Sequence, residues 1–265
     1  MKKAIMYLLL ALGITLVVLF ICGALVGFVA GFIDGFKGED LRSATSMTYM
    51  VGVGSVSIII LCVILNWVFL KYGFASYTIG RIPNTPKSIK WKVLLGSILV
   101  MAGFAIMSYP LFSRDMSDKF MIDSYVWMHD HLIFSILVIA ALEATVNLVI
   151  YGAILREVLE WKHRPWQVIL AYSCIMSLFS FFSFLEGTPS FPIMTMVIAQ
   201  FEGWMYEYTR SVIPIIIGDV AFWIVTLCMV GVPASGWFLL VGALVAGFSA
   251  LLALNPMEPY KPLED

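Results

Sequence analysis

Two acidic residues, Glu143 and Asp219, stand inside strongly apolar segments of this chain and are the side chains best suited to chemistry. Asn147 and Tyr151 follow Glu143 at spacings of four and eight residues. On a helix these three side chains share one face, because residues four apart are neighbours. If Glu143 and Asp219 lie close together, they would share one proton. Such groups suit a proton relay, a ligand pocket or an enzyme that uses a carboxylate as its base.

Three further polar residues fall in neighbouring apolar segments: Ser180, Ser183 and Glu202. Two interpretations stay open for the whole polar set. It forms either a binding or catalytic site, or a hydrogen-bonded network that holds the helices in register. The network is the more common use of such residues, because a polar group without a partner is costly in apolar surroundings.

The histidine pair His129 and His131 is a weaker candidate for a metal site. Residues two apart do not share a helix face, so the pair is poorly spaced to hold one ion. Asp130, between them, is expected to cap the N-terminus of the next helix. The cysteines are far apart in apolar runs and are expected to be free core thiols: Cys22, Cys62, Cys174 and Cys228. We therefore expect no metal and no other cofactor.

The composition indicates that most of the chain lies in a lipid bilayer. Of its 265 residues, 61% are hydrophobic and 12% are charged, whereas a soluble domain carries about twice that share of charge. Several apolar runs approach the roughly 20 residues that cross a bilayer as a helix. We expect an all-α polytopic bundle that forms a single domain, 1–265. Its eight or so expected spans are 5–33, 47–71, 94–112, 131–155, 166–185, 190–206, 211–232 and 235–254.

The basic residues predict the orientation of these spans. With both termini in the cytoplasm, most of the 16 Lys and Arg residues fall on the cytoplasmic side, and the opposite loops are mainly acidic. This bias follows the positive-inside rule. We expect an integral protein of a prokaryotic cytoplasmic membrane, surrounded by lipid, with a short cytoplasmic tail at 255–265. No nucleic-acid partner is expected, because no basic and aromatic binding surface is evident.

The first expected span has a glycine at every fourth position, at Gly23, Gly27, Gly31 and Gly35. On a helix these glycines form one bare stripe, along which another backbone can approach closely. The stripe serves either packing within the chain or docking of a partner helix. The last expected span has a weaker row of small residues, at Gly242, Ala246 and Ala250.

Residues 77–225 resemble the intramembrane CAAX-processing and bacteriocin-processing (CPBP) proteases. The resemblance rests on VNLVIYGAILREVLEWKHRPWQVILAYSCIMSLFSFFSF, from Val146, and on FEGWMYEYTRSVIPIIIGDVAFW, from Phe201. In that family one helix carries a glutamate pair and an arginine. Two later helices carry histidines, the second with an asparagine four residues further on. The resemblance implies a helical membrane bundle with a CPBP-like core at these residues.

The same resemblance implies that the catalytic residues of the family are missing. The glutamate pair, the arginine, the two histidines and the asparagine fall in turn on Val146, Asn147, Tyr151, Ser183, Gly218 and Phe222. Valine, glycine and phenylalanine can neither ligate a metal nor act as a base. The resemblance also implies that the stripe of Glu143, Asn147 and Tyr151 faces the former catalytic cavity.

Our expectation is therefore a non-catalytic relative, or pseudoprotease, that binds a membrane protein or a peptide as a scaffold, regulator or immunity factor. The immunity role comes from the resemblance, because relatives are associated with self-immunity to bacteriocins. Contact is expected at the glycine stripe and at the acidic outer loops. The alternative is an intramembrane hydrolase, or a protein that handles a ligand or protons. That alternative would use Glu143, Asn147, Tyr151 and Asp219.

Overall fold

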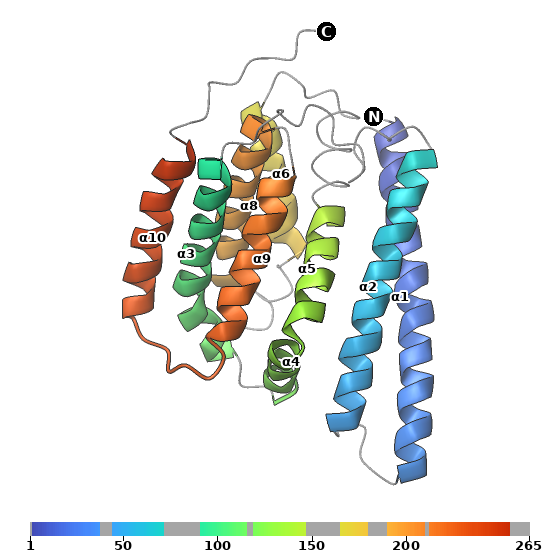
Figure 1. Cartoon of the computed structure of the whole chain (residues 1–265). Helices are drawn as coiled ribbons and strands as arrows, with labels where there is room; N and C mark the ends of the chain where they lie inside the picture. Colours follow the sequence, from blue (N-terminus) through green and yellow to red (C-terminus); the bar gives the residue numbers. More distant parts are fainter. Residues whose placement is uncertain are drawn as a thin grey trace.

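The computed structural model describes residues 2–37, 44–71, 91–115, 119–146, 165–179, 190–209 and 212–254. All regular structure in these ranges is helical, which confirms the all-α class (Figure 1). The helices are α1 (Lys2–Lys37), α2 (Ala44–Lys71), α3 (Trp91–Asp115), α4 (Lys119–Asp130), α5 (Leu132–Val146), α6 (Pro165–Phe179), α8 (Ser190–Thr209), α9 (Ile213–Cys228) and α10 (Trp237–Leu254).

The described helices coincide with the expected spans, with one addition. Helix α4, of 12 residues, lies where the sequence predicts an outer loop. It is too short and too polar to stand out by hydropathy. The later parts of the expected spans 131–155 and 166–185 lie outside the described residues. Within the described ranges, one helix, Trp91–Leu111, is long and apolar enough to cross a membrane by length and composition.

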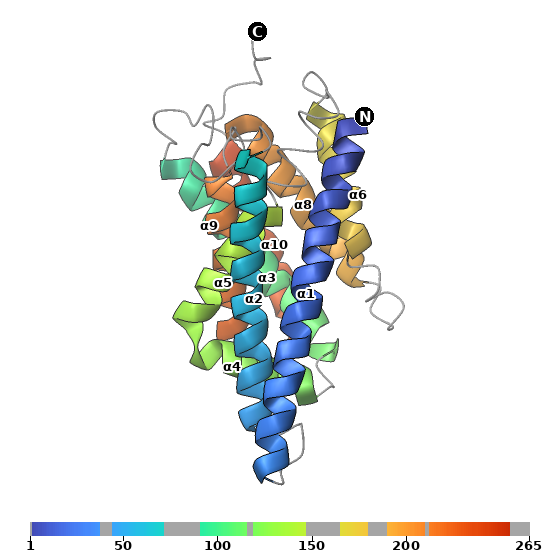
Figure 2. The same cartoon turned by 90° about the vertical axis from the view of Figure 1, so that its right-hand side faces the viewer.

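The helices pack as a bundle with a long hairpin at its side (Figures 1 and 2). Helix α3 lies between α9 and α10, and α6 packs on α8. Helix α5 bridges α9 and α2, and α1 packs along α2. The site described below lies where α5, α6, α8 and α9 come together with α3.

Helices α3 and α10 approach each other closely. A Cβ atom on Gly242 would lie 2.5 Å from the backbone nitrogen of Met107, and one on Gly103 would lie 2.6 Å from that of Ala246. Real side chains are not found at such distances, so glycine is required at both positions for this packing. The row of small residues in the last span therefore packs against α3 through Gly242 and Ala246.

A tight turn joins α9 to α10. Gly231 adopts a φ of 83°, a left-handed conformation that suits glycine because it has no Cβ atom. The hydroxyl of Tyr109, on α3, donates a hydrogen bond of 2.8 Å to the carbonyl oxygen of Val232. Its ring lies edge-to-face near Phe238 at the start of α10. These contacts hold the turn against α3.

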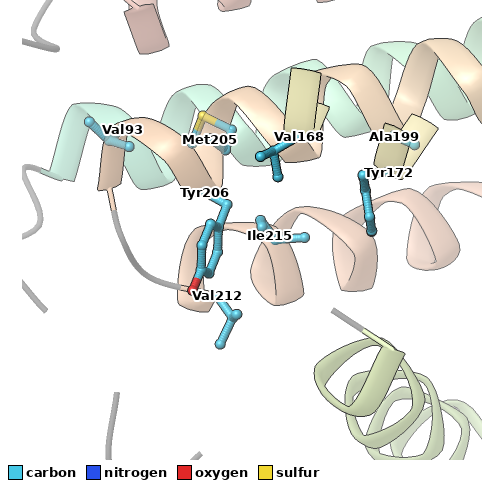
Figure 3. Close-up of a cluster of buried hydrophobic side chains, with 8 residues drawn as sticks. All are labelled: Val93, Val168, Tyr172, Ala199, Met205, Tyr206, Val212 and Ile215. Carbon is cyan, nitrogen blue, oxygen red and sulfur yellow. The ribbon is translucent and has the colours of Figure 1, made fainter. Parts of the chain in front are cut away.

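Buried apolar side chains join α6, α8, α9 and the start of α3 (Figure 3). The members of this cluster are Val93, Val168, Tyr172, Ala199, Met205, Tyr206, Val212 and Ile215. Tyr172 is fully buried among them, yet its hydroxyl is hydrogen-bonded to a carboxyl group. The apolar core therefore borders directly on a polar cavity.

Two expectations about single residues are wrong. Of the described free cysteines, Cys62 is buried, but Cys174 and Cys228 face outward instead of lying in the core. Asp130 ends α4 and does not occupy the N-cap position of α5, which begins at Leu132. Its carboxylate lies 3.3 Å from Nδ1 of His129 instead.

Candidate functional site

An acidic cavity of about 250 Å³ lies between α3, α5, α6, α8 and α9. Three carboxyl groups line it, from Glu143 on α5, Glu202 on α8 and Asp219 on α9. Thr195 is a further polar residue of the lining. The rest of the described lining is apolar and consists of Met101, Met176, Met194, Ile198, Ala199, Phe222 and Trp223.

The packing of α9 on α3 fixes the direction of Asp219. Pro214 lies in the first turn of α9, where its missing N–H costs no helix hydrogen bond. Its carbonyl oxygen accepts a hydrogen bond of 2.6 Å from the Ser97 hydroxyl. A Cβ atom on Gly218 would lie 2.6 Å from that hydroxyl oxygen, so glycine permits the contact. The next residue, Asp219, is thereby held in the lining of the cavity.

A hydrogen bond connects α6 to α8, and its acceptor lies close to an acid of α9. The Tyr172 hydroxyl donates to Oε2 of Glu202 over 2.8 Å. Glu202 and Asp219 lie close enough for their carboxyl groups to interact. Ionised carboxylates can only accept hydrogen bonds, so a bond between these two carboxyl groups would require one of them to carry a proton.

Asp219 carries a buried carboxyl oxygen that has no hydrogen-bond partner in the described residues. This atom is Oδ2, and the side chain as a whole is 4% exposed. An acceptor that is buried without a donor costs about 1–3 kcal/mol. A ligand that supplies a donor at this atom would recover that free energy.

Glu143 completes the acidic group from the other side of the cavity. It is half-buried and lies close enough to Glu202 and Asp219 for their charges to interact. No Lys, Arg or His is present among the described residues of the lining. At most a fraction of the three carboxyl groups can be ionised together, because buried like charges repel strongly.

The structure brings together Glu143 and Asp219 in one cavity, and it adds Glu202 to the lining. The other polar candidates, Asn147, Tyr151, Ser180 and Ser183, lie outside the described residues. Val146 belongs to α5, one turn beyond Glu143. On α9, Gly218 and Phe222 are both buried around Asp219.

Sequence reasoning missed Tyr172, Thr195 and Trp223. Each lies in an apolar segment, and Tyr172 has no helical spacing from any of the three acidic residues. Trp223 follows Asp219 by four residues, which places both on one face of α9. That spacing is the single sequence signal that would have linked Trp223 to the site.

The histidine pair lies at the junction of α4 and α5 and does not form a shared site. His131 stacks on Trp127 with ring centroids 4.2 Å apart, and its Nδ1 atom lies 2.9 Å from the Trp127 carbonyl oxygen. His129 instead pairs with Asp130. The described residues contain no group of three or more His, Cys, Asp or Glu arranged to hold a metal ion.

The glycine stripe of α1 faces away from the described chain. Nothing within the described residues lies within 4 Å of a Cβ atom placed on these glycines: Gly23, Gly27, Gly31 and Gly35. A row of exposed phenylalanines runs beside the stripe, at Phe20, Phe28, Phe32 and Phe36. Packing of the stripe within the described chain is therefore not observed.

Comparison of the chain with protein-family models, with curated proteins and with solved structures gives no match. The resemblance to CPBP proteases stays a prediction from the sequence.

Proposed function

We propose that this protein is a polytopic integral membrane protein whose acidic cavity binds a small ligand. The observation that carries this proposal is the group of three carboxyls in a mostly apolar cavity, with an oxygen on Asp219 that has no hydrogen-bond partner in the described residues. Buried acidic groups without a counter-charge destabilise a protein. They are expected within a membrane where they serve binding or proton transfer.

The distribution of polarity supports a membrane location. Large apolar side chains cover the outside of the described helices, among them Phe20, Ile133, Leu178, Leu240 and Phe248. Polar side chains are buried inside, at Ser57, Ser97, Ser108, Ser135, Ser173, Glu202, Glu207, Asp219, Thr226 and Ser249. Soluble monomers rarely expose large continuous apolar surfaces. In a bilayer, by contrast, apolar lipid chains surround such a surface favourably.

The positions of the helix ends support the predicted orientation. The start of α1, the ends of α2 and α10, and the start of α3 lie at one end of the molecule (Figure 1). Two of these ends carry the exposed residues Lys71 and Lys92. Helix α4, with Asp123 and Asp130, lies at the opposite end (Figure 1). With the basic end in the cytoplasm, the start of α1 and the end of α10 both lie on the cytoplasmic side, as the positive-inside rule favours.

The cavity then lies within reach of the cytoplasmic side. Asp219 follows the first residue of α9, Ile213, by six positions. At about 1.5 Å per residue this places it about 9 Å from the helix start. A ligand would reach the site from the cytoplasm or from the inner half of the bilayer.

We also propose that the protein descends from a CPBP protease, as the resemblance of its sequence implies. Glu143 lies on the α5 helix, three residues before Val146, and Asp219 lies between Gly218 and Phe222. These are the helices on which the resemblance would place the catalytic residues. A binding site would thus have replaced a proteolytic site at the same place in the bundle.

Native mass spectrometry of the protein taken from its own membranes in mild detergent tests the ligand-binding function. We expect a bound small molecule on the wild type, lost in Asp219→Asn because that change alters the carboxyl network. Glu207→Gln is the matched control, since Glu207 is a buried acid on the same helix as Glu202 but does not line the cavity. A wild-type protein without any bound small molecule, or a bound molecule retained in Asp219→Asn, would contradict this function.

A second candidate function is docking of another membrane helix on α1. The observation that favours it is the outward-facing stripe of glycines beside an exposed aromatic row. Small residues on a helix surface allow a second helix to approach closely in lipid. This function corresponds to the scaffold, regulatory or immunity role expected from the resemblance.

Crosslinking in membranes tests the docking function. Gly27→Leu and Gly31→Leu should each abolish a crosslinked heteromeric product, because leucine would fill the stripe. Asp219→Asn should leave that product unchanged, since Asp219 lies on α9 and faces the cavity. A product that survives both glycine substitutions would place the contact elsewhere.

A further inference from the structure

We propose that the cavity binds a small, partly apolar organic amine as its ammonium form, with Asp219 and Glu143 facing the charge and Trp223 against the apolar part. This proposal names the class of ligand, and it rests on the ligand-binding function proposed above. Three features of the cavity support it, namely its acidic residues, the unpartnered oxygen of Asp219 and its aromatic wall.

The charge of the cavity selects a cation. The described lining offers three carboxyl groups and no basic side chain. An anionic ligand would add like charge beside these carboxyl groups, whereas an ammonium group would be attracted to them. The N–H groups of an ammonium ion are also the donors that the buried Oδ2 atom of Asp219 lacks. Hydrogen bonds between charged partners are about twice as strong as those between neutral groups.

The apolar wall selects an organic cation over a bare ion. Phe222 and Trp223 line the cavity together, with their rings edge-to-face and their centroids 5.8 Å apart. Tyr125, from α4, stacks on Trp223 at 6.4 Å and supports it. Trp is the best aromatic partner for a cation, and its face also covers apolar groups. Three methionines on the remaining walls provide adaptable contacts for a hydrocarbon body.

The arrangement of the carboxyl groups also disfavours a single-atom ion. The described acids do not form a cluster that could ligate one metal ion. They lie on three helices around the cavity, and an amine with several N–H donors can bridge such separated acceptors. The volume of about 250 Å³ corresponds to roughly eight water molecules at about 30 Å³ each. The ligand is therefore small, of the size of a phenylalkylamine.

Binding of the ammonium ion is coupled to loss of a proton. The titratable groups that line the cavity are Glu143 on α5, Glu202 on α8 and Asp219 on α9, and no described titratable residue of α3 lines it. Tyr172 on α6 does not line the cavity but donates a hydrogen bond to Glu202. When the ligand enters, one carboxyl O–H bond breaks, its proton passes to water, and the resulting carboxylate accepts from the ligand N–H. No covalent bond forms to the ligand. One positive charge enters and one leaves, so the buried charge stays constant.

Calorimetry with purified protein in lipid nanodiscs tests this inference, with 2-phenylethylamine as the probe. Its neutral analogue 2-phenylethanol keeps the shape and loses the charge, and empty nanodiscs report partitioning into lipid. We expect the amine to bind at least tenfold more tightly than the alcohol. Titrations in buffers of different ionisation enthalpy should show up to one proton released for each amine bound. Asp219→Asn and Glu143→Gln should each weaken amine binding at least tenfold, and Glu207→Gln should leave it unchanged.

Several outcomes would overturn the inference. Equal binding of amine and alcohol would show a neutral apolar site, and amine binding unaffected by both cavity variants would place it elsewhere. Absence of amine binding, while native mass spectrometry still shows another bound small molecule, would overturn the ligand class and keep the ligand-binding function. Absence of both would overturn the function as well. A cooperative thermal unfolding transition shows that each variant is folded. If Asp219→Asn does not fold, Glu143→Gln is the variant that tests the inference.

Discussion

The Tyr172 hydroxyl is a buried hydrogen-bond donor to Glu202. It donates to Glu202 from within an otherwise apolar cluster, so it is a fixed donor to a carboxyl group that lines the cavity. Other buried hydroxyls, such as those of Ser173 and Thr226, instead donate to carbonyl oxygens four residues earlier in their own helices. Those bonds satisfy the hydroxyl locally. The bond from Tyr172 joins two helices.

Removal of this hydroxyl should therefore destabilise the protein through Glu202. We expect Tyr172→Phe to lower the free energy of unfolding by about 1–3 kcal/mol, because it leaves a buried acceptor without its donor. In a Glu202→Leu background the same change should cost much less, since the acceptor is gone. Thermal or denaturant unfolding in detergent measures both. An equal cost in the two backgrounds would mean that Tyr172 acts through packing alone.

At the scale of elements, α3 is the helix against which the site is built. It packs on α10 through glycines and on α9 through Ser97 and Gly218. Interhelical contacts of this closeness depend on the absence of side chains at the crossing point. A change on the α10 side should therefore affect the stability of the bundle without contacting the cavity.

Alanine at Gly242 tests this packing. We expect Gly242→Ala to destabilise the protein by about 1–3 kcal/mol, because the new methyl group would overlap the backbone of α3. Gly247→Ala, on the same helix, has open space at its Cβ atom and should be neutral or stabilising by up to about 1 kcal/mol. The melting temperatures of the two variants in detergent give the comparison. If both variants melt alike, α10 does not pack on α3 as described.

At the scale of the whole molecule, several polar groups are buried while many large apolar side chains are exposed. The buried set includes Glu202 and Asp219, while residues such as Phe28 and Leu137 are exposed. Water would not stabilise this arrangement, because the hydrophobic effect favours burial of the apolar side chains. The arrangement becomes favourable when lipid surrounds the helices.

Labelling of Cys174 tests the lipid environment. This thiol is exposed on the surface of α6, so in water it would react readily. We expect a single-cysteine protein with Cys174 to resist a maleimide in membranes permeabilised to the reagent and to react after denaturation. Ala234→Cys, in the exposed turn between α9 and α10, should react in membranes permeabilised to the reagent. Rapid reaction of Cys174 under those conditions would place this face of α6 in water.

The sequence by itself determined the helical class, the approximate helix positions and the acidic character of the site. Apolar runs have a length and composition that lead to helices, because backbone groups must be satisfied locally where water is excluded. Glu143 and Asp219 stand out for the same reason, since charged residues are rare in such runs. The small-residue face at Gly242 and Ala246 could also be predicted from the sequence, because small residues at helical spacing form one face of a helix.

Only the tertiary structure decided which of these residues meet. The sequence separates Tyr172, Glu202 and Asp219 by intervals that carry no periodic signal, and their contact depends on how α6, α8 and α9 cross. The outward direction of the α1 glycines and of Cys174 is a rotational property of helices that are apolar on all sides. Such helices have no polar face from which their rotation can be predicted. Packing of side chains between helices supplies that information, and it exists only in the folded protein.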